Sequence, residues 1–358
     1  MTQSLAKRIP CAVLGATGVV GQRLVARLSR HPWFELAHLC ASEKSAGKRY
    51  ADACEWRLGP ERGPAHGGVG DLVVERCDPA RVAAPLVFSA LDTEPARELE
   101  PAFAQAGSFV ASNASAFRMA SDVPIVIPEL NAAHLDLVLE QRRARGWRGA
   151  IVCKPNCTTV PVALPLGVLD AAFGVEAVHA TSLQAVSGAG WPGVSSLDIL
   201  GNVVPFIRGE EEKLEQETVK LLGRLGERAI LAASFPVSAA CHRVPVENGH
   251  MVAVSVRLRG APSVDAVRAA LDAWRPSTLE HALPSAPARA LVVHSAENRP
   301  QPKLDAESHD GMSVHVGRVR RCAVLGIQFS ALVHNAERGA AGGNVLYAEL
   351  ARARGLFG

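Results

Sequence analysis

Apolar and polar residues follow two different patterns along the chain, and the change between them falls near residue 154. Residues 9–14 form a short apolar run typical of a buried strand, and residues 19–29 place apolar side chains on one helical face. Residues 35–41 are apolar again. A strand, a glycine turn, a helix and a second strand make a βαβ unit, whose crossover should be right-handed.

The same alternation continues through the first 150 or so residues. We expect strands at residues 72–75, 86–90, 108–112 and 124–127, with a helix at residues 94–105. Alternating strands and helices predict an α/β protein with a Rossmann-type, doubly wound parallel sheet at its N-terminus. We assign residues 1–154 to this domain and expect residues 336–358, with a helix at 339–354, to complete it.

The second half, residues 155–335, shows a different mixture of elements. Strand-like runs occur at residues 176–184, 250–258, 290–294 and 322–332. Helices are predicted at residues 159–173, 210–225 and 264–274, and proline and glycine mark loops at residues 58–70 and 284–302. This pattern indicates an α+β domain built on a mixed or largely antiparallel sheet.

Composition narrows the class of protein. The chain has 358 residues, of which 48% are hydrophobic and 20% charged, and its formal net charge is +3. A weak basic excess without dense runs of Lys and Arg argues against a nucleic-acid partner. No apolar stretch is long enough for a membrane helix, and residues 1–10 lack the apolar core of a signal peptide. A cytoplasmic protein that contacts neither nucleic acid nor membrane is expected.

The chain contains 8 cysteines, and none of them forms a C-x-x-C pair. A zinc or iron–sulfur framework is therefore not expected, and we predict no bound metal. A disulfide framework is also not expected in a cytosolic chain of this length. Most cysteines should be small buried residues, and only one of them needs to have a chemical role.

The glycine turn after the first strand predicts a dinucleotide site. Glycines at 15, 18 and 21 allow the backbone to approach a pyrophosphate, and the helix N-terminus offers free N–H groups. The residues expected at the cofactor are Gly15, Thr17, Gly18, Val19 and Val20.

The end of the second strand bears on the choice between NAD and NADP. Glu43 alone would suggest NAD, because an acidic residue there binds the ribose hydroxyls. Ser42, Lys44 and Ser45 instead suit a 2′-phosphate, which needs hydrogen-bond donors and positive charge. NADP is therefore the expected cofactor.

Cys157 lies at the start of an apolar helix, where a thiol pKa is expected to be lowered and the thiolate can act as a nucleophile. Cys153 is the rival, but it ends a strand-like run and should be buried. Downstream, Arg243 could clamp a carboxylate with its two-pronged guanidinium, and either His242 or His250 could move protons near neutral pH. From chemistry alone the two histidines remain alternatives.

Six motifs occur in the order seen in aspartate-β-semialdehyde dehydrogenases, and the chain resembles the archaeal and fungal branch of that family. The resemblance extends from about residue 9 to residue 350. The motifs are the glycine turn, Asn113-Ala114-Ser115-Ala116-Phe117-Arg118-Met119, Pro155-Asn156-Cys157-Thr158-Thr159, Ser187-Gly188-Ala189-Gly190, Glu210-Glu211-Glu212-Lys213 and the segment from Arg243 to His250.

The resemblance implies roles for individual residues. Cys157 would be the acyl-thioester nucleophile, His250 the acid/base, and Gln184 a residue beside the reacting carbon. For the substrate, it implies Arg243 at the α-carboxylate, Glu210 at the ammonium group, and Arg118 and Lys213 at the phosphate with Asn113 nearby. For the cofactor, it adds Ser187, Gly188 and Asn335.

The resemblance also implies an activity. It is the reversible, phosphate-dependent reduction of L-aspartyl 4-phosphate to L-aspartate 4-semialdehyde with NADPH, in the biosynthesis of lysine, threonine, methionine and isoleucine. The second domain would carry catalysis and dimerisation, giving a homodimer or homotetramer that binds only small-molecule substrates. Departures from the family pattern occur at Asp92, Thr158 and His242. The alternatives are a reductase for another acyl phosphate, such as N-acetylglutamyl phosphate, a malonyl-CoA reductase-like enzyme and a non-enzymatic NADP-binding paralogue.

Overall fold

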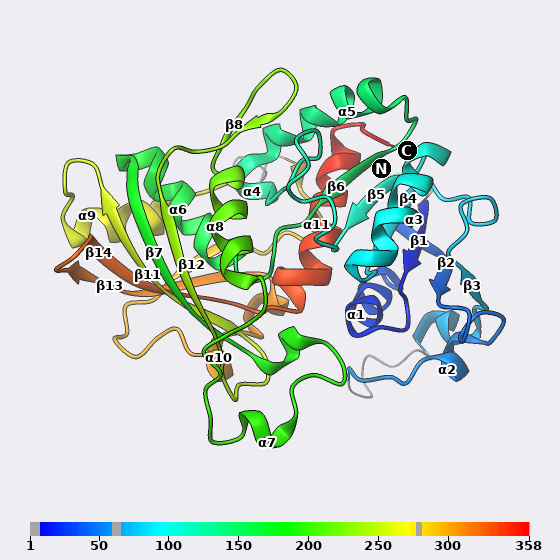
Figure 1. Cartoon of the computed structure of the whole chain (residues 1–358), viewed down its shortest axis with the longest axis horizontal. Helices are drawn as coiled ribbons and strands as arrows, with labels where there is room; N and C mark the ends of the chain where they lie inside the picture. Colours follow the sequence, from blue (N-terminus) through cyan, green and yellow to red (C-terminus); the bar gives the residue numbers. More distant parts are fainter. Residues whose placement is uncertain (1–7, 59–65, 277–280, 358) are drawn as a thin grey trace, which may run out of the picture.

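The computed structural model describes residues 8–58, 66–276 and 281–357. Two halves, each built on a sheet, lie side by side (Figure 1). The expectations for residues 1–7 and for the part of the first loop at residues 59–65 lie outside the described residues. Within the described ranges, no helix is long and apolar enough to cross a membrane.

The first sheet is parallel throughout and has the strand order β3-β2-β1-β4-β5-β6. This is the order of a doubly wound dinucleotide-binding sheet, so the predicted fold class is confirmed for this half. Its strands are β1 (Ile9–Leu14), β2 (Phe34–Ala41), β3 (Val74–Arg76), β4 (Leu86–Ser89), β5 (Phe109–Ser112) and β6 (Ala150–Cys153).

Helices cover both faces of this sheet because successive strand residues point to opposite sides. Val13 packs in the core with α1 (Val19–Leu28) and α11 (Gly342–Ala353), whereas Leu14 packs with α3 (Thr93–Ala106) on the other face. The chain thus returns at its C-terminal end to complete the first core (Figure 1).

One expectation for this half was wrong. The apolar run at residues 124–127 is buried but forms only an isolated bridge between Ile125 and Cys153, because the chain turns into α4 (Pro128–Asn131). The sixth strand is β6 instead. Two further helices, α2 (Tyr50–Ala53) and α5 (Leu137–Arg145), were not predicted.

The second sheet is mixed, as the sequence predicted, with the strand order β10-β7-β11-β14-β13-β12. β10 and β12 run parallel to their neighbours, and the other pairs are antiparallel. Its strands are β7 (Val175–Gln184), β10 (Val237–Arg243), β11 (His250–Leu258), β12 (Leu291–Val293), β13 (Val314–Cys322) and β14 (Gly326–Val333). A separate two-stranded ribbon pairs β8 (Arg224–Leu225) with β9 (Ile230–Leu231).

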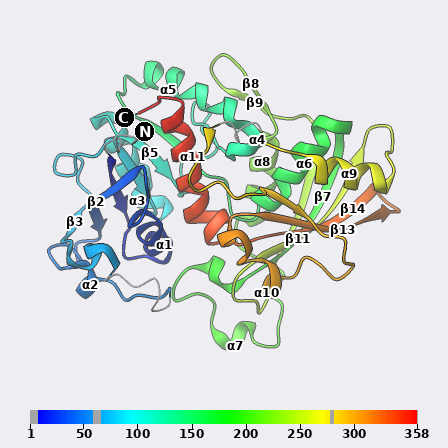
Figure 2. The same ribbon diagram turned by 180° about the vertical axis from the view of Figure 1, so that it is seen from behind.

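Helices cover one face of the second sheet. α6 (Val160–Phe173), α8 (Glu210–Leu221) and α9 (Val264–Ala273) pack apolar side chains onto its core. The other face is open along β7, where His179 and Leu183 are exposed. Two short helices, α7 (Ser196–Ile199) and α10 (Pro302–Asp305), lie at the lower edge seen from behind (Figure 2).

Three predictions for the second half need correction. The run at residues 322–332 is not one strand, because β13 ends at Cys322 and β14 begins at Gly326 after a turn. β10 was not predicted. The final helix is preceded by a π-helical turn, Glu337–Ala341, and α8 ends at Leu221 rather than at residue 225.

Candidate active site

Cys157 lies on a tight turn between β6 and α6, where the two halves meet. Asn156 Oδ1 accepts a hydrogen bond from the Thr158 N–H at 2.7 Å, and Asn156 O accepts one from the Thr159 N–H at 3.1 Å. A Cβ on Gly339 would lie 2.8 Å from the Cys157 Cβ. Hydrogen bonds within the turn therefore fix its conformation, and only a glycine fits beside Cys157 at position 339.

Glu217 of α8 ties this turn to Arg118, one of the expected phosphate ligands. Its buried carboxylate accepts hydrogen bonds from the Asn156 N–H at 2.5 Å and from Arg118 Nη1 at 2.9 Å. Arg118 Nη2 donates to Asn113 O at 2.8 Å. Among the described residues, no hydrogen-bond partner reaches the buried Arg118 Nε or Asn113 Oδ1. Both atoms are available for a polar ligand.

Glu210 joins two of the other expected site residues, Lys213 and Gln184, to Asn156 of the nucleophile turn. Its carboxylate accepts hydrogen bonds from Asn156 Nδ2 at 3.0 Å, from Lys213 Nζ at 2.9 Å and from Gln184 Nε2 at 3.3 Å. Glu210 begins α8 and Gln184 ends β7, so these contacts connect a helix N-terminus to a strand end.

The acidity of Cys157 differs from the expectation. Burial raises the pKa of its thiol, the Glu210 carboxylate raises it further, and Lys154 and Arg118 lower it. The predicted lowering by the helix N-terminus was therefore wrong for the free chain, because loss of hydration outweighs the nearby positive charges. Cys153 is fully buried as expected, and burial raises its pKa to about 12.

Lys154 is a site residue that we did not predict. Its ammonium group donates to Pro155 O, and burial, assisted by the charge of Arg118, lowers its pKa to about 7. Its interaction with Cys157 acts in the opposite direction and favours the charged amine. Lys154 is therefore a cation close to the candidate nucleophile whose charge is lost near neutral pH.

His250 begins β11 and is completely buried. Its Nδ1 accepts a hydrogen bond from the Ala185 N–H at 3.1 Å, so the neutral ring carries its proton on Nε2. No partner for Nε2 is found in the part of the chain that the structure describes. Burial, followed by the charge of Arg243, lowers the pKa of His250 to about 3, so the ring is neutral at physiological pH.

Arg243 ends β10 next to His250. Its Nη1 donates to Ala185 O at 2.9 Å, and it is close enough to Cys157 for their charges to interact. A Cβ on Gly188 would lie 2.8 Å from His250 Nε2 and 2.9 Å from Arg243 Nη1. Gly188 therefore leaves open the space beside both polar groups.

The alternative histidine, His242, faces elsewhere. It is half-buried, and its Nδ1 lies 3.3 Å from Ser182 O. Asn335 fixes the glycine loop behind His250, because its Nδ2 donates to Ser187 Oγ at 2.9 Å while its Oδ1 accepts from the Gly249 N–H at 2.9 Å.

A cavity of about 850 Å³ opens at the carboxyl ends of β1 and β4, the switch point of the first sheet. A Cβ on Gly15 would lie 2.7 Å from Ala90 O, and one on Gly21 would lie 2.1 Å from Gly15 O. Both positions therefore require glycine. The predicted residues that line the cavity are Gly15, Thr17, Gly18, Val19, Val20 and Ser42.

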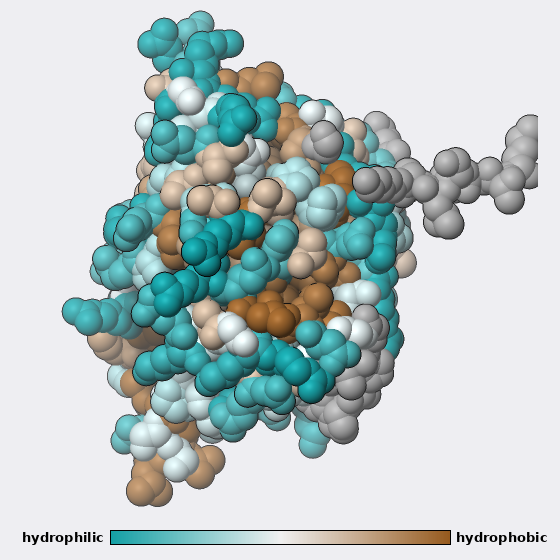
Figure 3. All heavy atoms as spheres, turned by 90° about the vertical axis from the view of Figure 1, so that its right-hand side faces the viewer, coloured by the Kyte–Doolittle hydropathy of each residue, from teal (hydrophilic) through white to brown (hydrophobic). Residues whose placement is uncertain are grey.

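The cavity lining just after β2 differs from the expectation for the NADP 2′-phosphate. Lys44 and Ser45 are not among its described lining residues, whereas Glu43 and Arg76 are, and these two form an ion pair at 3.2 Å. Asp92, one of the departures from the family pattern, also lines it. Figure 3 views the molecule from the side of the first sheet, where hydrophilic side chains surround a central apolar area.

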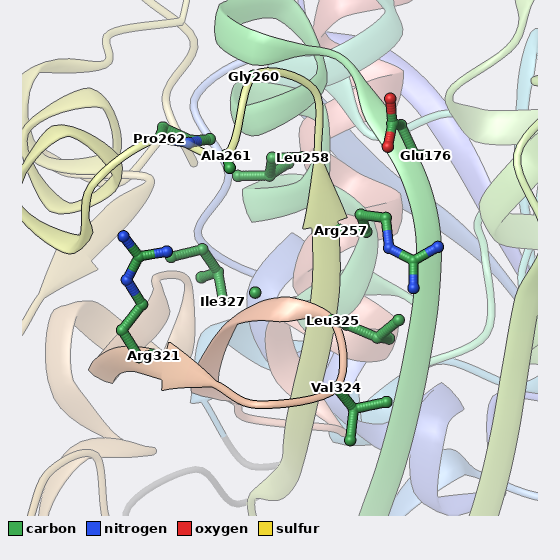
Figure 4. Close-up of a pocket in the computed structure, with 11 residues that line it drawn as sticks. Glu176, Arg257, Leu258, Gly260, Ala261, Pro262, Arg321, Val324, Leu325 and Ile327 are labelled. Carbon is green, nitrogen blue, oxygen red and sulfur yellow. The ribbon is translucent and has the colours of Figure 1, made fainter.

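A second cavity, of about 390 Å³, lies at the opposite end of the second sheet (Figure 4). Glu176 of β7, Arg257 of β11 and Arg321 of β13 surround it. His250 and Leu258 stand at opposite ends of β11, which at about 3.3 Å per residue are roughly 26 Å apart. This cavity is therefore separate from the candidate active site.

Two family models match the chain. The semialdehyde dehydrogenase NAD-binding domain matches residues 10–138, and the semialdehyde dehydrogenase dimerisation domain matches residues 166–336. Aspartate-semialdehyde dehydrogenase of Archaeoglobus fulgidus is 47% identical over 343 residues, covering 96% of this chain and 98% of that protein. The Saccharomyces cerevisiae enzyme is 41% identical, with 96% and 98% covered.

A solved structure, aspartate semialdehyde dehydrogenase with NADP from Candida albicans, superposes with a TM-score of 0.88 at 39% identity and covers 98% of this chain and 100% of that one. A cofactor-type Rossmann sheet lies beside a mixed sheet, with a half-buried cysteine, a buried histidine and a buried arginine between them. Together they define an oxidoreductase of the semialdehyde dehydrogenase class. The chain belongs to the aspartate-semialdehyde dehydrogenase family. The predicted family is therefore confirmed.

Proposed function

We propose that the chain interconverts L-aspartyl 4-phosphate and L-aspartate 4-semialdehyde, with NADP(H) and inorganic phosphate, in the biosynthesis of lysine, threonine, methionine and isoleucine. One observation carries the proposal. The half-buried Cys157 lies within electrostatic reach of Lys154, Arg118 and Arg243, and beside Arg243 is a neutral histidine whose Nε2 has no partner among the described residues. These groups suit a reaction that places negative charge on sulfur, phosphate and carboxylate.

Cys157 carries the acyl group in this proposal. Its thiolate attacks the acyl carbon, the S–C bond forms, the C–O bond to phosphate breaks, and inorganic phosphate leaves with the bonding electron pair. Arg118 and Lys213 bind the departing phosphate. Arg118 is suited to this because its buried Nε has no partner in the described structure and because Glu217 fixes the position of its Nη1.

His250 stabilises the oxygen of the reacting carbonyl. Because its Nδ1 is occupied by the Ala185 N–H, the neutral ring has its remaining proton on Nε2. A hydrogen bond from Nε2 to the developing oxyanion stabilises the tetrahedral state, and this state collapses when the thiolate leaves. We assign Gln184, which donates to Glu210, a place beside the reacting carbon.

Arg243 and Glu210 recognise the amino-acid end of the substrate. Arg243 uses Nη1 on Ala185 O and has further N–H groups for a carboxylate. The Glu210 carboxylate binds the ammonium group in place of Lys213, which is then free to bind phosphate. The site would then bind both an ammonium group and a phosphate group, which favours an amino-acid acyl phosphate over a CoA thioester as the substrate.

The residues around the large cavity fit NADP. Glycine at position 15 leaves the backbone open beside Ala90 O, and a volume of about 850 Å³ is sufficient for a dinucleotide. Thr17, Gly18 and Ser42 would hold the cofactor, and Arg76 adds positive charge beside Ser42. When bound, NADPH supplies the hydride that reduces the acyl carbon.

The open face of the second sheet supports a homodimer as the smallest assembly. β7 alternates buried and exposed positions, and Leu183 is exposed on the face that no helix covers. The semialdehyde dehydrogenase dimerisation-domain model matches the residues of this sheet, which supports a contact between subunits on this face. We also propose two domains, because each is built on one of the two sheets. The cofactor domain comprises residues 1–154 and 336–358, and the catalytic domain comprises residues 155–335.

The test follows NADPH formation from aspartate semialdehyde and NADP, with and without phosphate. We expect phosphate-dependent turnover that is lost in Cys157→Ala and kept in Cys153→Ala, the matched buried cysteine. Turnover with malonyl-CoA and NADPH but none with aspartate semialdehyde would replace the proposed substrate. Equal activity of Cys157→Ala and the parent chain would reject the nucleophile.

A further inference from the structure

Two histidines and an aspartate come together away from the active site. His294 follows β12, His315 lies on β13, and Asp305 ends α10. One ligand atom of each lies within 4.8 Å of those of the other two. His294 Nε2 is 3.1 Å from His315 Nδ1 and 3.8 Å from Asp305 Oδ1. We propose that these three side chains bind a zinc ion, with water as the fourth ligand.

The spacing of the two nitrogens fits a shared metal ion. Zinc–nitrogen bonds of about 2.0–2.1 Å at a tetrahedral angle place two ligand atoms roughly 3.3 Å apart. The observed 3.1 Å between His294 and His315 is close to that edge, so the ion needs only a small separation of the rings. Two imidazoles and one carboxylate form a set of protein ligands that zinc commonly takes.

The hydrogen bonds of His315 show that its Nδ1, the nitrogen that faces His294, can act as the metal ligand. Ser308 Oγ donates to Asp305 O at 2.7 Å and so must accept from His315 Nε2, which lies 3.0 Å away. His315 Nδ1 is therefore unprotonated, and its lone pair accepts a hydrogen bond from His294 Nε2 that a metal ion would replace. A hydrogen-bonded second nitrogen is the usual support for a histidine ligand.

The aspartate is also held in place. Arg299 donates to both Asp305 carboxylate oxygens, and the Gln301 N–H donates to Oδ2 at 2.6 Å. Oδ2 accepts two of these hydrogen bonds, whereas Oδ1 accepts one and keeps a second lone pair for a metal. The positive charge of Arg299 opposes a cation, so we expect micromolar rather than tighter affinity.

The proposed ion would stabilise the segment behind the catalytic histidine. A Cβ on Gly249 would lie 3.0 Å from Pro302 Cβ and 3.2 Å from Ala306 Cβ, so α10 packs directly behind the residue before His250. His315 is two strands from β11, roughly 10 Å across the sheet. The cluster is therefore outside the catalytic site but supports it. Our expectation of no metal rested on the absence of paired cysteines, and this set contains none.

The experiment uses the full chain carrying Cys157→Ala, because an active-site thiolate can bind zinc itself. After dialysis against a chelator, bound zinc is measured by equilibrium dialysis with ZnCl2. We expect a single zinc per chain and a melting temperature that rises by about 5 °C at saturating zinc. His315→Gln and His294→Gln should each weaken binding at least about tenfold.

Two controls make the test specific. His309→Asn alters the ring that stacks on His315 at 6.4 Å without removing a proposed ligand, and it should bind zinc like the parent. Cobalt substituted for zinc should give the absorption of a four-coordinate ion without thiolate charge transfer. Because His315 is buried, His315→Gln could fail to fold, and zinc binding by His294→Gln then tests the proposal. Equal zinc binding by parent and His294→Gln, a thiolate spectrum, or no retained zinc would overturn the proposal.

Discussion

Replacing Glu217 with glutamine tests how the nucleophile turn is held. Glu217 and Arg118 form a 2.9 Å ion pair with side chains only 2% and 8% exposed. Glu217→Gln keeps the shape but leaves a buried guanidinium without its counter-ion. Loss of one partner from a buried pair costs about 3 kcal/mol or more, which lowers the melting temperature of a chain this size by roughly 6 °C.

The matched control is Glu212→Gln, an exposed glutamate on the same helix. Thermal unfolding of both variants and the parent, at one protein concentration, isolates the effect of burial. Glu212→Gln should unfold within about 1 °C of the parent, because surface charges contribute little. A Glu217→Gln protein as stable as Glu212→Gln would refute the argument that this ion pair holds the turn.

Four other predictions follow from the site. In steady-state kinetics, kcat/KM for aspartate semialdehyde should rise with pH beyond the ordinary thiol pKa of about 8.5, because burial raises the pKa of Cys157. Gly339→Ala should lower kcat about a hundredfold with unchanged NADP affinity, because its Cβ would lie 2.8 Å from that of Cys157; normal turnover would contradict this. Arg243→Lys should raise KM for the semialdehyde about tenfold, with loss of one charge-assisted bond to the carboxylate. In denaturant titrations, the free energy of unfolding should fall by up to about 1.4 kcal/mol per pH unit as the pH drops from 6.5 toward 3. In this range His250 is protonated in the unfolded chain but stays neutral in the folded one, because burial lowers its pKa to about 3. His250→Gln should reduce this slope.

Elements with a strong local period could be predicted from the sequence. β1, α1, α6, α9 and β11 follow apolar runs or helical faces that are buried in the structure, and their bounds differ from prediction by no more than a residue or so. β13 was missed because charged residues interrupt its apolar alternation: Arg318, Arg320 and Arg321 are all exposed to solvent. The apolar run at 124–127 was misread because burial alone does not distinguish a strand from an extended segment that leads into a helix.

The chemistry of the site was less accessible from sequence. Cys157, Arg243 and His250 belong to recognisable motifs, and the structure brings them together from the turn after β6, from β10 and from β11. Glu217 seemed to be one more acidic residue on a polar helix. Its position, seven residues after Glu210 on the same helical face, was the available signal. The raised pKa of the thiol depends on tertiary burial and could not be predicted from local sequence.

The most direct test of the account is whether Cys157 carries the substrate covalently. The full chain is mixed with aspartate semialdehyde and NADP without phosphate, quenched in acid, and analysed by mass spectrometry of the intact protein and its peptides. The account predicts a burst of a single NADPH per active site and an aspartyl group on the peptide that contains Cys157, with both lost in Cys157→Ala and kept in Cys153→Ala. A burst without a protein-bound aspartyl group, or an adduct on any other residue, would contradict it.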